Sequence, residues 1–256
     1  MRKSEIIELL EEAVIRHNRW DFIEFDPIRV PHAFRAAADI EIAAFFSALL
    51  SWGSRPSIIK SAERLMNAMD RAPHDFVMQA QTRDLHFVHR TFNSLDLSHL
   101  IAFLRYHYSR HQSLEDAFLV DGKFDAYQSL STFHSRVFTA PVQPHFRTRK
   151  HIANPEAGSA CKRLNMFLRW MVRKDQAGVD FGLWARISMA QLHIPLDVHV
   201  QRTALELGLL KRRQSDWRAC SELTQSLSRF DPLDPVRYDF ALFGLGLDSK
   251  LRPKSQ

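Results

Sequence analysis

Apolar residues recur every three or four positions along most of this 256-residue chain, and this spacing constrains its fold more than any other feature. In residues 6–14 and again in 97–104, the apolar side chains fall on one face of a helix with 3.6 residues per turn. Alternating apolar and polar runs bounded by hairpin turns are missing, and only 8 residues are Gly. The sequence therefore predicts an all-α, almost entirely helical protein.

The same spacing sets the extent of the expected helices. They are predicted over residues 4–18, 38–51, 55–69, 74–80, 96–109, 113–119, 123–138, 158–173, 180–186, 197–207, 215–229 and 235–243. The most loop-like stretch runs from Thr139 to Pro155. We predict one domain over residues 1–256 with a subdomain seam near residue 145.

The chain carries 35 Lys and Arg residues against 29 Asp and Glu, a formal net charge of +6. This excess indicates an anionic partner, for which nucleic acid is a better candidate than a membrane. Two cysteines, Cys161 and Cys220, are too few for a disulfide framework and suit a reducing cytoplasm. The N-terminus is charged rather than signal-like, and the longest apolar run, 42–50, is too short to cross a membrane. We expect a cytoplasmic protein with no membrane partner.

The segment Pro195–Arg202 places one acid, Asp197, where a helix is expected to begin. Proline disfavours the helical conformation in the residue before it and favours a helix start just beyond. Asp is a preferred N-cap because its side chain accepts hydrogen bonds from first-turn N–H groups. Asp197 is therefore either an ordinary structural cap or a functional carboxylate that follows a basic helix.

That basic helix is predicted after Gly158. Gly158 and Ser159 form a turn, and the N–H groups of the helix that follows can hold a phosphate. Lys162, Arg163 and Arg169 then supply cations for DNA, and Lys162 near an acid could act as an amine nucleophile. The alternative is an amphipathic helix whose cations are merely solvated.

Turn, basic helix and a Leu-Asp-x-His-Val segment together resemble the helix-hairpin-helix DNA glycosylase superfamily, which includes 8-oxoguanine and endonuclease III-like enzymes. The run from Lys162 to Arg169 is similar to that of the 8-oxoguanine branch. The acid segment is matched by Asp197, His199 and Arg202. The resemblance implies a two-lobed helical fold with a modified helix-hairpin-helix, a cleft between the lobes, and a hairpin and catalytic segment at about 150–210.

Two further matches extend the resemblance. Residues 49–62 look like the early helix-loop-helix that approaches the lesion, which makes Trp52 and Gly53 candidates for the base pocket or wedge. Trp184 and Phe240 are further candidates, with core packing as the alternative for each aromatic residue. More closely, the segments 158–166 and 238–246 are similar to a bacterial family of conserved hypothetical proteins related to that superfamily.

The alignment of the hairpin leaves two alternatives open. The superfamily's hairpin has two glycines, with the lysine two positions after the second, whereas Lys162 follows Gly158 by four. Anchoring on the glycine puts Ala160 in the lysine position, while anchoring on the helix makes Lys162 the nucleophile. The helix alignment matches more residues, and the segment 173–184 is then an insertion, either shaping the base pocket or forming a surface loop.

Other acids in family-like segments are expected to be caps or paired structural groups: Asp26, Asp39, Glu41 and Asp239. The histidines show no metal-ligand spacing, and no acid of the zinc-protease type lies between His107 and His111. We therefore expect no metal and no cofactor.

The resemblance implies a DNA glycosylase, possibly with AP-lyase activity, that cleaves the N-glycosidic bond of a flipped damaged base. Its partner would be duplex DNA with a damaged base, and the protein is expected to be a monomer. Two alternatives are a non-catalytic nucleic-acid-binding module on the same fold and a helical protein-interaction scaffold.

Overall fold

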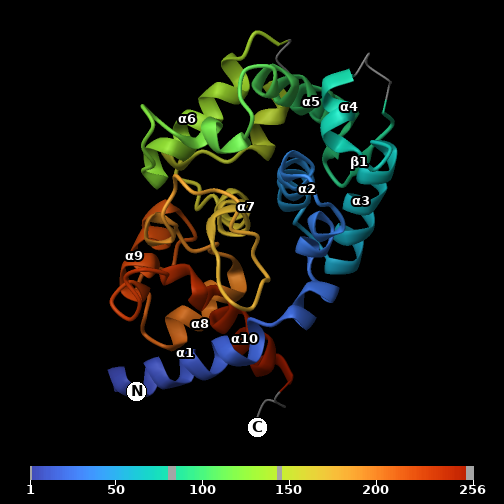
Figure 1. The fold of residues 1–256 in the computed structure, drawn as a ribbon. Coiled ribbons are helices and arrows are strands. Elements are labelled where there is room, and N and C mark those ends of the chain that lie inside the picture. The colour runs from blue at the N-terminus through green and yellow to red at the C-terminus, as the bar shows by residue number, and fades with distance from the viewer. Residues whose placement is uncertain (1, 80–84, 143–145, 252–256) are drawn as a thin grey trace. The chain divides into compact units, whose positions relative to one another are not determined.

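The computed structural model describes residues 2–79, 85–142 and 146–251, and within them the chain is mostly helical, as predicted (Figure 1). The α-helices are α1 (Lys3–His17), α2 (Ala37–Leu49), α3 (Arg55–Ala68), α4 (Pro73–Gln79), α5 (Ser94–Tyr108), α6 (Ala126–Thr139), α7 (Lys162–Val172), α8 (Val198–Glu206), α9 (Trp217–Leu227) and α10 (Tyr238–Leu251). Two short strands, β1 (Val88–His89) and β2 (Phe92–Asn93), pair antiparallel. The sequence did not predict this small hairpin.

Short segments of 3-10 helix connect many of these elements. They are η1 (Trp20–Phe25), η2 (Pro27–Arg29), η3 (Pro31–Ala33), η4 (Leu114–Phe118), η5 (Phe146–His151), η6 (Pro155–Ala157), η7 (Met189–Gln191) and η8 (Pro235–Arg237). Four of them begin at proline, whose fixed φ suits the first position of a helix and whose missing N–H costs nothing there.

The helix predicted over 180–186 is wrong. The backbone N–H of Phe181 donates to the carbonyl of Trp170 at 2.8 Å, and that of Trp184 donates to the carbonyl of Met171 at 3.0 Å. The segment therefore uses its donors on the last turn of α7 instead of on a helix of its own. Gly182, with φ +57, also interrupts the helical conformation.

Backbone contacts divide the chain into two compact units. Unit 1 comprises Met1–Phe22 and Pro155–Gln256, and unit 2 comprises Ile23–Asn154. The seam predicted near residue 145 lies outside the described residues.

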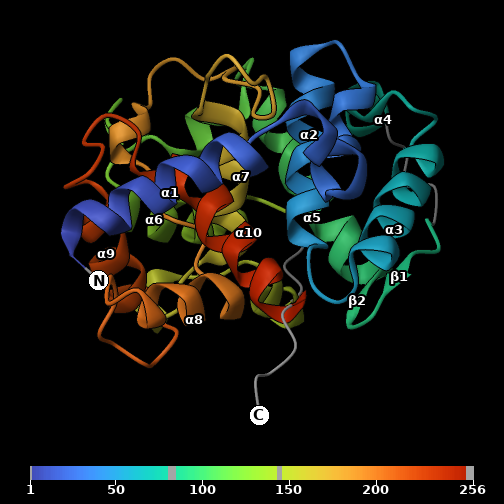
Figure 2. The same ribbon diagram turned by 90° about the horizontal axis from the view of Figure 1, so that it is seen from below.

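In unit 1 the two ends of the chain come together. α1 lies along α10, and α10 also packs on α8 (Figure 2). Where α10 meets α1 it carries Gly244, and a Cβ there would lie 2.1 Å from Cδ2 of His17, so the approach requires glycine. The core beneath these helices includes Leu10, Val14, Ile194, Leu196, Val200, Ala204, Leu223, Leu227 and Leu242.

Unit 2 is organised around α2, whose residues 40–50 are all buried. A helix that is apolar on every side belongs inside a domain, where α3 and α4 pack on it. Its one buried acid, Glu41, accepts hydrogen bonds from the hydroxyl of Tyr108 at 2.7 Å and the backbone N–H of Leu114 at 2.9 Å. The prediction of a paired structural acid is confirmed for Glu41. No helix within the described part of the chain is long and apolar enough to span a membrane.

Candidate active site

The turn before α7 is held by its own side chains. Gly158 has φ +79 and Cys161 has φ +50, so two left-handed residues reverse the chain within four positions. The hydroxyl of Ser159 accepts from the backbone N–H of Cys161 at 3.1 Å, and the carbonyl of Gly158 accepts from the backbone N–H of Trp217 at 3.1 Å. These bonds fix Lys162 as the first residue of α7.

The segment on the other side of this turn is not an α-helix. Residues 146–151 and 155–157 form the 3-10 turns η5 and η6 instead. A helix-hairpin-helix joins two α-helices, whereas among the described residues around this turn only the segment after it, α7, is an α-helix.

Asp197 caps α8, as the sequence predicts. Its Oδ1 accepts from the backbone N–H groups of His199 at 2.8 Å and Val200 at 2.9 Å. Both bonds reach the same oxygen, and no hydrogen bond comes to Oδ2 from the residues that the structure describes. The half-buried carboxylate thus keeps one oxygen for another partner.

A third group, Asp239 in the first turn of α10, links Lys162 to Asp197. Burial raises the pKa of Asp239 to about 6, against the lowering effect of the Arg169 charge. The Asp197 carboxylate raises that pKa further and the Lys162 ammonium lowers it, so both charges act on Asp239. Both predicted catalytic residues therefore influence the pKa of Asp239.

Arg169 does not lie at a surface where it could contact DNA phosphate. Its side chain is 5 % exposed, its Nε lies 3.2 Å from Oδ1 of Asp180, and its Nη1 donates to Asp239. This corrects the expectation of a phosphate contact, because both acids already compensate the guanidinium charge inside unit 1.

Arg173, one turn further along, completes this network. Its guanidinium lies 3.1 Å from Asp180, 2.9 Å from Asp234 and 2.8 Å from Asp175. The Asp180 carboxylate bridges the two arginines with one oxygen to each. We call these two arginines and the acids Asp175, Asp180, Asp234 and Asp239 the arginine network.

Phe240 and Trp184 take the core-packing alternative. Phe240 is 2 % exposed, with its ring 4.4 Å from the Arg169 guanidinium and edge-on to Phe22. Trp184 is 4 % exposed and packs edge-on against Phe167. Both side chains therefore belong to the core of unit 1, and their role at a base pocket or as a wedge stays a prediction.

The other predicted DNA contacts are placed differently. Gly158 is exposed, while Ser159 and Arg163 are half-buried at the turn and the start of α7. His199 packs edge-on against Phe243. Arg202 is exposed and donates to the carbonyl of Gly246 at 3.0 Å.

Trp52 and Gly53 belong to unit 2, in the loop after α2. The half-buried Trp52 ring stacks on His89 and lies 5.1 Å from the ring of His151. Gly53 is exposed, with φ +106. Their pocket role stays a prediction.

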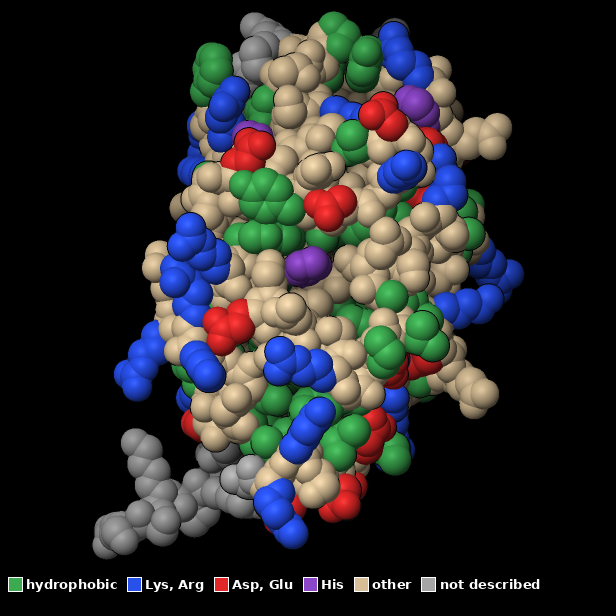
Figure 3. Space-filling model, turned by 90° about the vertical axis from the view of Figure 1, so that its left-hand side faces the viewer, with side chains coloured by type: hydrophobic (Ala, Val, Ile, Leu, Met, Phe, Trp, Pro, Cys, Tyr) green, Lys and Arg blue, Asp and Glu red, His purple; other side chains and the backbone are tan. Residues whose placement is uncertain are grey.

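Exposed charge alone does not mark a DNA surface on the face drawn in Figure 3. Its Lys and Arg side chains are interspersed with acidic and apolar ones instead of gathering in one patch. The candidate site therefore depends on geometry in unit 1 and not on a basic surface.

A family model described as "Protein of unknown function (DUF2400)" matches residues 26–248. The chain belongs to the DUF2400 family. No curated protein and no solved structure matches it. The matched span of this DUF2400 chain includes Lys162, Asp197 and Asp239, almost all of unit 2, and unit 1 from Pro155 to Asp248 but not its first segment, Met1–Phe22.

Two members of the arginine network, Asp180 and Asp234, carried no sequence signal in this DUF2400 chain. Asp180 lies in the loop after α7, at an irregular spacing from the arginines that it contacts. Asp234 lies just before η8, far in sequence from Arg173. A carboxylate in a loop is ordinarily solvated, so composition gives no reason to bury it. Such a carboxylate meets its arginine only in the folded chain.

Proposed function

We propose that this protein is a DNA glycosylase-like base-excision enzyme that cleaves the N-glycosidic bond of a damaged base flipped out of duplex DNA. The observation that carries the proposal is the Asp197 carboxylate, whose Oδ1 is held by two N–H groups of α8 while Oδ2 accepts no hydrogen bond from the described residues. The two-lobed fold with a cleft, implied by the resemblance, is part of the same proposal.

Asp197 has the properties that this reaction requires of an acid. Breaking the bond between base and deoxyribose builds positive charge on the sugar, and an ionised carboxylate stabilises that charge. Oδ1 is fixed by the two N–H groups of α8, and Oδ2 is the oxygen left to face a sugar.

Lys162 would decide between two routes for the attack on the sugar. If its neutral amine attacks the anomeric carbon, the C–N bond to the base breaks, and the base leaves with the bonding electrons and takes a proton from Nζ. The C1′–O4′ bond of the sugar then opens, O4′ takes the second Nζ proton, and an imine forms between Nζ and C1′. That Schiff base permits strand cleavage. If water attacks instead, the product is an abasic site and Lys162 serves only to bind DNA.

The decisive experiment uses Asp197→Asn. An Asn side chain still accepts hydrogen bonds and remains a good N-cap, so α8 keeps its start while the negative charge is lost. On a panel of damaged-base duplexes we expect base release to fall by about 10²–10³-fold, the size of one electrostatic contribution to catalysis. Asp125→Asn, which changes the N-cap of α6 in the same way, is the matched control and should leave release unchanged.

Borohydride trapping then separates the two routes. A trapped protein–DNA adduct that disappears in Lys162→Ala supports the amine route, and base release without an adduct supports the water route. Salt-sensitive DNA binding with no release from any lesion would overturn the proposal in favour of a binding module. No DNA binding at all would favour a protein-interaction scaffold.

A further inference from the structure

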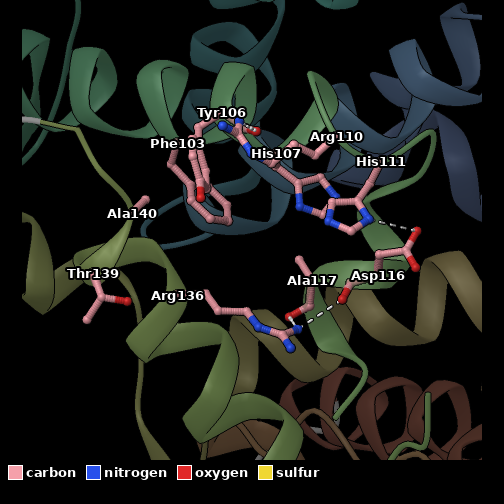
Figure 4. Close-up of a pocket in the computed structure, with 10 residues that line it drawn as sticks. All are labelled: Phe103, Tyr106, His107, Arg110, His111, Asp116, Ala117, Arg136, Thr139 and Ala140. Atoms are coloured by element: carbon pink, nitrogen blue, oxygen red, sulfur yellow. Dashed lines mark hydrogen bonds and ion pairs between the residues drawn. The ribbon is translucent and has the colours of Figure 1, made fainter. Parts of the chain in front are cut away.

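A pocket in unit 2 offers a ligand little more than one guanidinium. It measures about 290 Å³ and lies between α5, η4 and α6 (Figure 4). The rings of Phe103 and His107 are buried, and the Arg110 guanidinium lies 3.8 Å from the ring centroid of Tyr106. Arg136 donates from Nη1 to two carbonyls, and its Nε and Nη2 meet no acceptor among the described residues. A larger group of cations without acceptors lies in unit 1.

This group belongs to the loop between α8 and α9, residues 208–216, and to the first turn of α9. Its four cations are Lys211, Arg212, Arg213 and Arg218. Of these, Arg212 is used within the fold, because its Nε donates to Oδ1 of Asp216 at 2.8 Å. The other three side chains are exposed and make no hydrogen bond or ion pair with the described part of the chain. We call Lys211, Arg213 and Arg218 the cationic cluster.

The backbone beneath the cationic cluster is fixed from both sides. Nε2 of Gln201, on α8, donates to the carbonyl of Arg213 at 3.0 Å. The backbone N–H of Lys211 donates to Oε1 of Glu222, on α9, at 2.8 Å. Both bonds use main-chain atoms of the loop, so the cationic side chains are held at defined places without being consumed.

The third member of the cluster is placed against the preference of its helix. Arg218 is the second residue of α9, and the first turn of that helix contains no acid. The aligned peptide dipoles leave a partial positive charge at this end, so a cation here does not stabilise the helix. Asp216, the N-cap, is already bonded to Arg212. An anion from outside the chain would offset the charge that remains.

The cluster lies beside the candidate site of unit 1. The backbone N–H of Trp217 donates to the carbonyl of Gly158 at 3.1 Å, and an isolated β-bridge joins the same two segments. The start of α9 therefore lies against the turn that precedes α7. On the other side, Gln201 holds the loop from a position one turn beyond Asp197 on α8.

The loop presents cations without an apolar anchor. Its two leucines, Leu209 and Leu210, are buried in the core of unit 1. Binding at a membrane surface combines cations with apolar side chains that enter the lipid, and these are missing from the exposed part of this loop. Cations alone are sufficient for the phosphates of a nucleic acid.

We propose that the cationic cluster binds the phosphate backbone of duplex DNA beside the candidate site of unit 1. The proposal rests on the proposed function, from which DNA follows as the partner. Lys and Arg side chains contact phosphates without reading bases, so the cluster supplies affinity and holds the duplex in place. It confers no preference for a base sequence or for a lesion.

The test measures binding of the full chain to an undamaged duplex by fluorescence anisotropy at salt concentrations from about 50 to 200 mM. Lys211→Gln, Arg213→Gln and Arg218→Gln should each reduce the slope of log K against log salt by about 0.9, the amount for one lost phosphate contact. The triple variant should bind at least about tenfold more weakly at the lowest salt, since it lacks three such contacts.

Arg229→Gln is the matched control. Arg229 is an exposed arginine just beyond the other end of α9, about 16 Å from Arg218 along the helix. Its removal changes the net charge by the same amount and should leave the slope as in wild type. An equal fall in this variant would show a response to net charge alone and would overturn the proposal.

Urea unfolding guards against loss of fold. Because the three side chains are exposed, each variant should unfold at the same urea concentration as wild type. An unchanged slope in all three variants overturns the proposal, as does a wild-type protein that binds no duplex. Tighter binding of a duplex RNA of the same length, lost in the same variants, overturns the assignment to DNA.

The result is separable from that of base excision, because the duplex carries no lesion. A reduced slope in the three variants, with no base released from any lesion by wild type, supports the cationic cluster and overturns the proposed enzyme. Base release by wild type with unchanged slopes in the variants supports the enzyme and overturns the role of the cluster.

Discussion

Two pairs of arginines in this protein have opposite surroundings. In unit 1, Arg169 and Arg173 are buried and share four carboxylates of the arginine network. In unit 2, Arg110 and Arg136 line a pocket whose one carboxylate belongs to Asp116. Both pairs lie on or just after helices, yet only the second has donors left for a ligand.

The difference shows what a count of cations leaves out. A buried guanidinium requires acids and hydrogen bonds to offset its desolvation, and once these are present it contributes to structure and not to binding. A guanidinium that is held by carbonyl groups keeps its charge uncompensated, and an anion can then bind to it. The role of an arginine here is decided by its acceptors.

The strongest test of this comparison is Arg173→Met. Removing the guanidinium leaves Asp175, Asp180 and Asp234 without their shared cation inside unit 1. Breaking a buried ion pair on one side costs about 3–5 kcal/mol. We expect a loss of that size in the free energy of unfolding, measured by urea denaturation at pH 7.

Arg29→Gln is the matched control, since Arg29 pairs with Glu63 at 3.3 Å on the surface of unit 2. An exposed pair contributes about 0–1 kcal/mol, so this variant should unfold close to wild type. Equal losses in the two variants would contradict a structural role for the arginine network.

The next largest effect is a pH dependence from Asp239. Its pKa is about 6 in the folded protein against an ordinary 3.8, so the folded state holds the proton more tightly than the unfolded state between these values. The stability contributed by this group is therefore greatest below pH 4, falls as pH rises to 6 and is constant above it. The fall is on the order of 2–3 kcal/mol.

Asp239→Asn removes this titration, so its stability relative to wild type should rise between pH 4 and 7 by that amount. Urea unfolding at four or five pH values in this range measures the difference. Asp125→Asn, at an exposed cap, should give a difference that does not vary as steeply. Parallel curves for Asp239→Asn and wild type would show that Asp239 is ionised in the fold at all these pH values.

A smaller loss of stability is expected for Arg136→Gln. The variant leaves the carbonyls of Asp116 and Ala117 without their shared donor, which costs about 1–2 kcal/mol. This is well below the loss for Arg173→Met, because no carboxylate is left unpaired. Thermal unfolding of the two variants side by side gives the ranking, and a larger loss for Arg136→Gln would reverse the comparison between the pairs.

The sequence predicted most of the local structure. Apolar spacing located α1, α2, α3, α5 and α6 to within a few residues, because each helix buries one stripe or, for α2, its whole surface. The Asp197 cap was equally accessible, since a cap is a local preference of a residue and its first turn. The hydrogen bonds from Phe181 and Trp184 to α7 could not be predicted in this way, because they join segments that are separate in the sequence.

The site was predictable in part for the same reason. Lys162 and Asp197 stand out by their place at helix starts, whereas Asp239, whose pKa both charges influence, is identified only in the folded chain, where α10 packs on α8. Arg169 was misassigned because a cation on a helix looks the same in sequence whether it faces solvent or an acid from a distant loop. Tertiary pairing decides such cases.

The smallest effect on stability separates Arg110 from every other arginine in the comparison. Arg110 is exposed and donates only to its own helix and to Ser109, so Arg110→Gln should change the free energy of unfolding by less than about 0.5 kcal/mol. An exposed guanidinium that bonds only its own helix end leaves no buried partner unpaired when it is removed. Urea unfolding of Arg110→Gln beside Arg136→Gln measures the difference, and an equal loss in the two variants would contradict it.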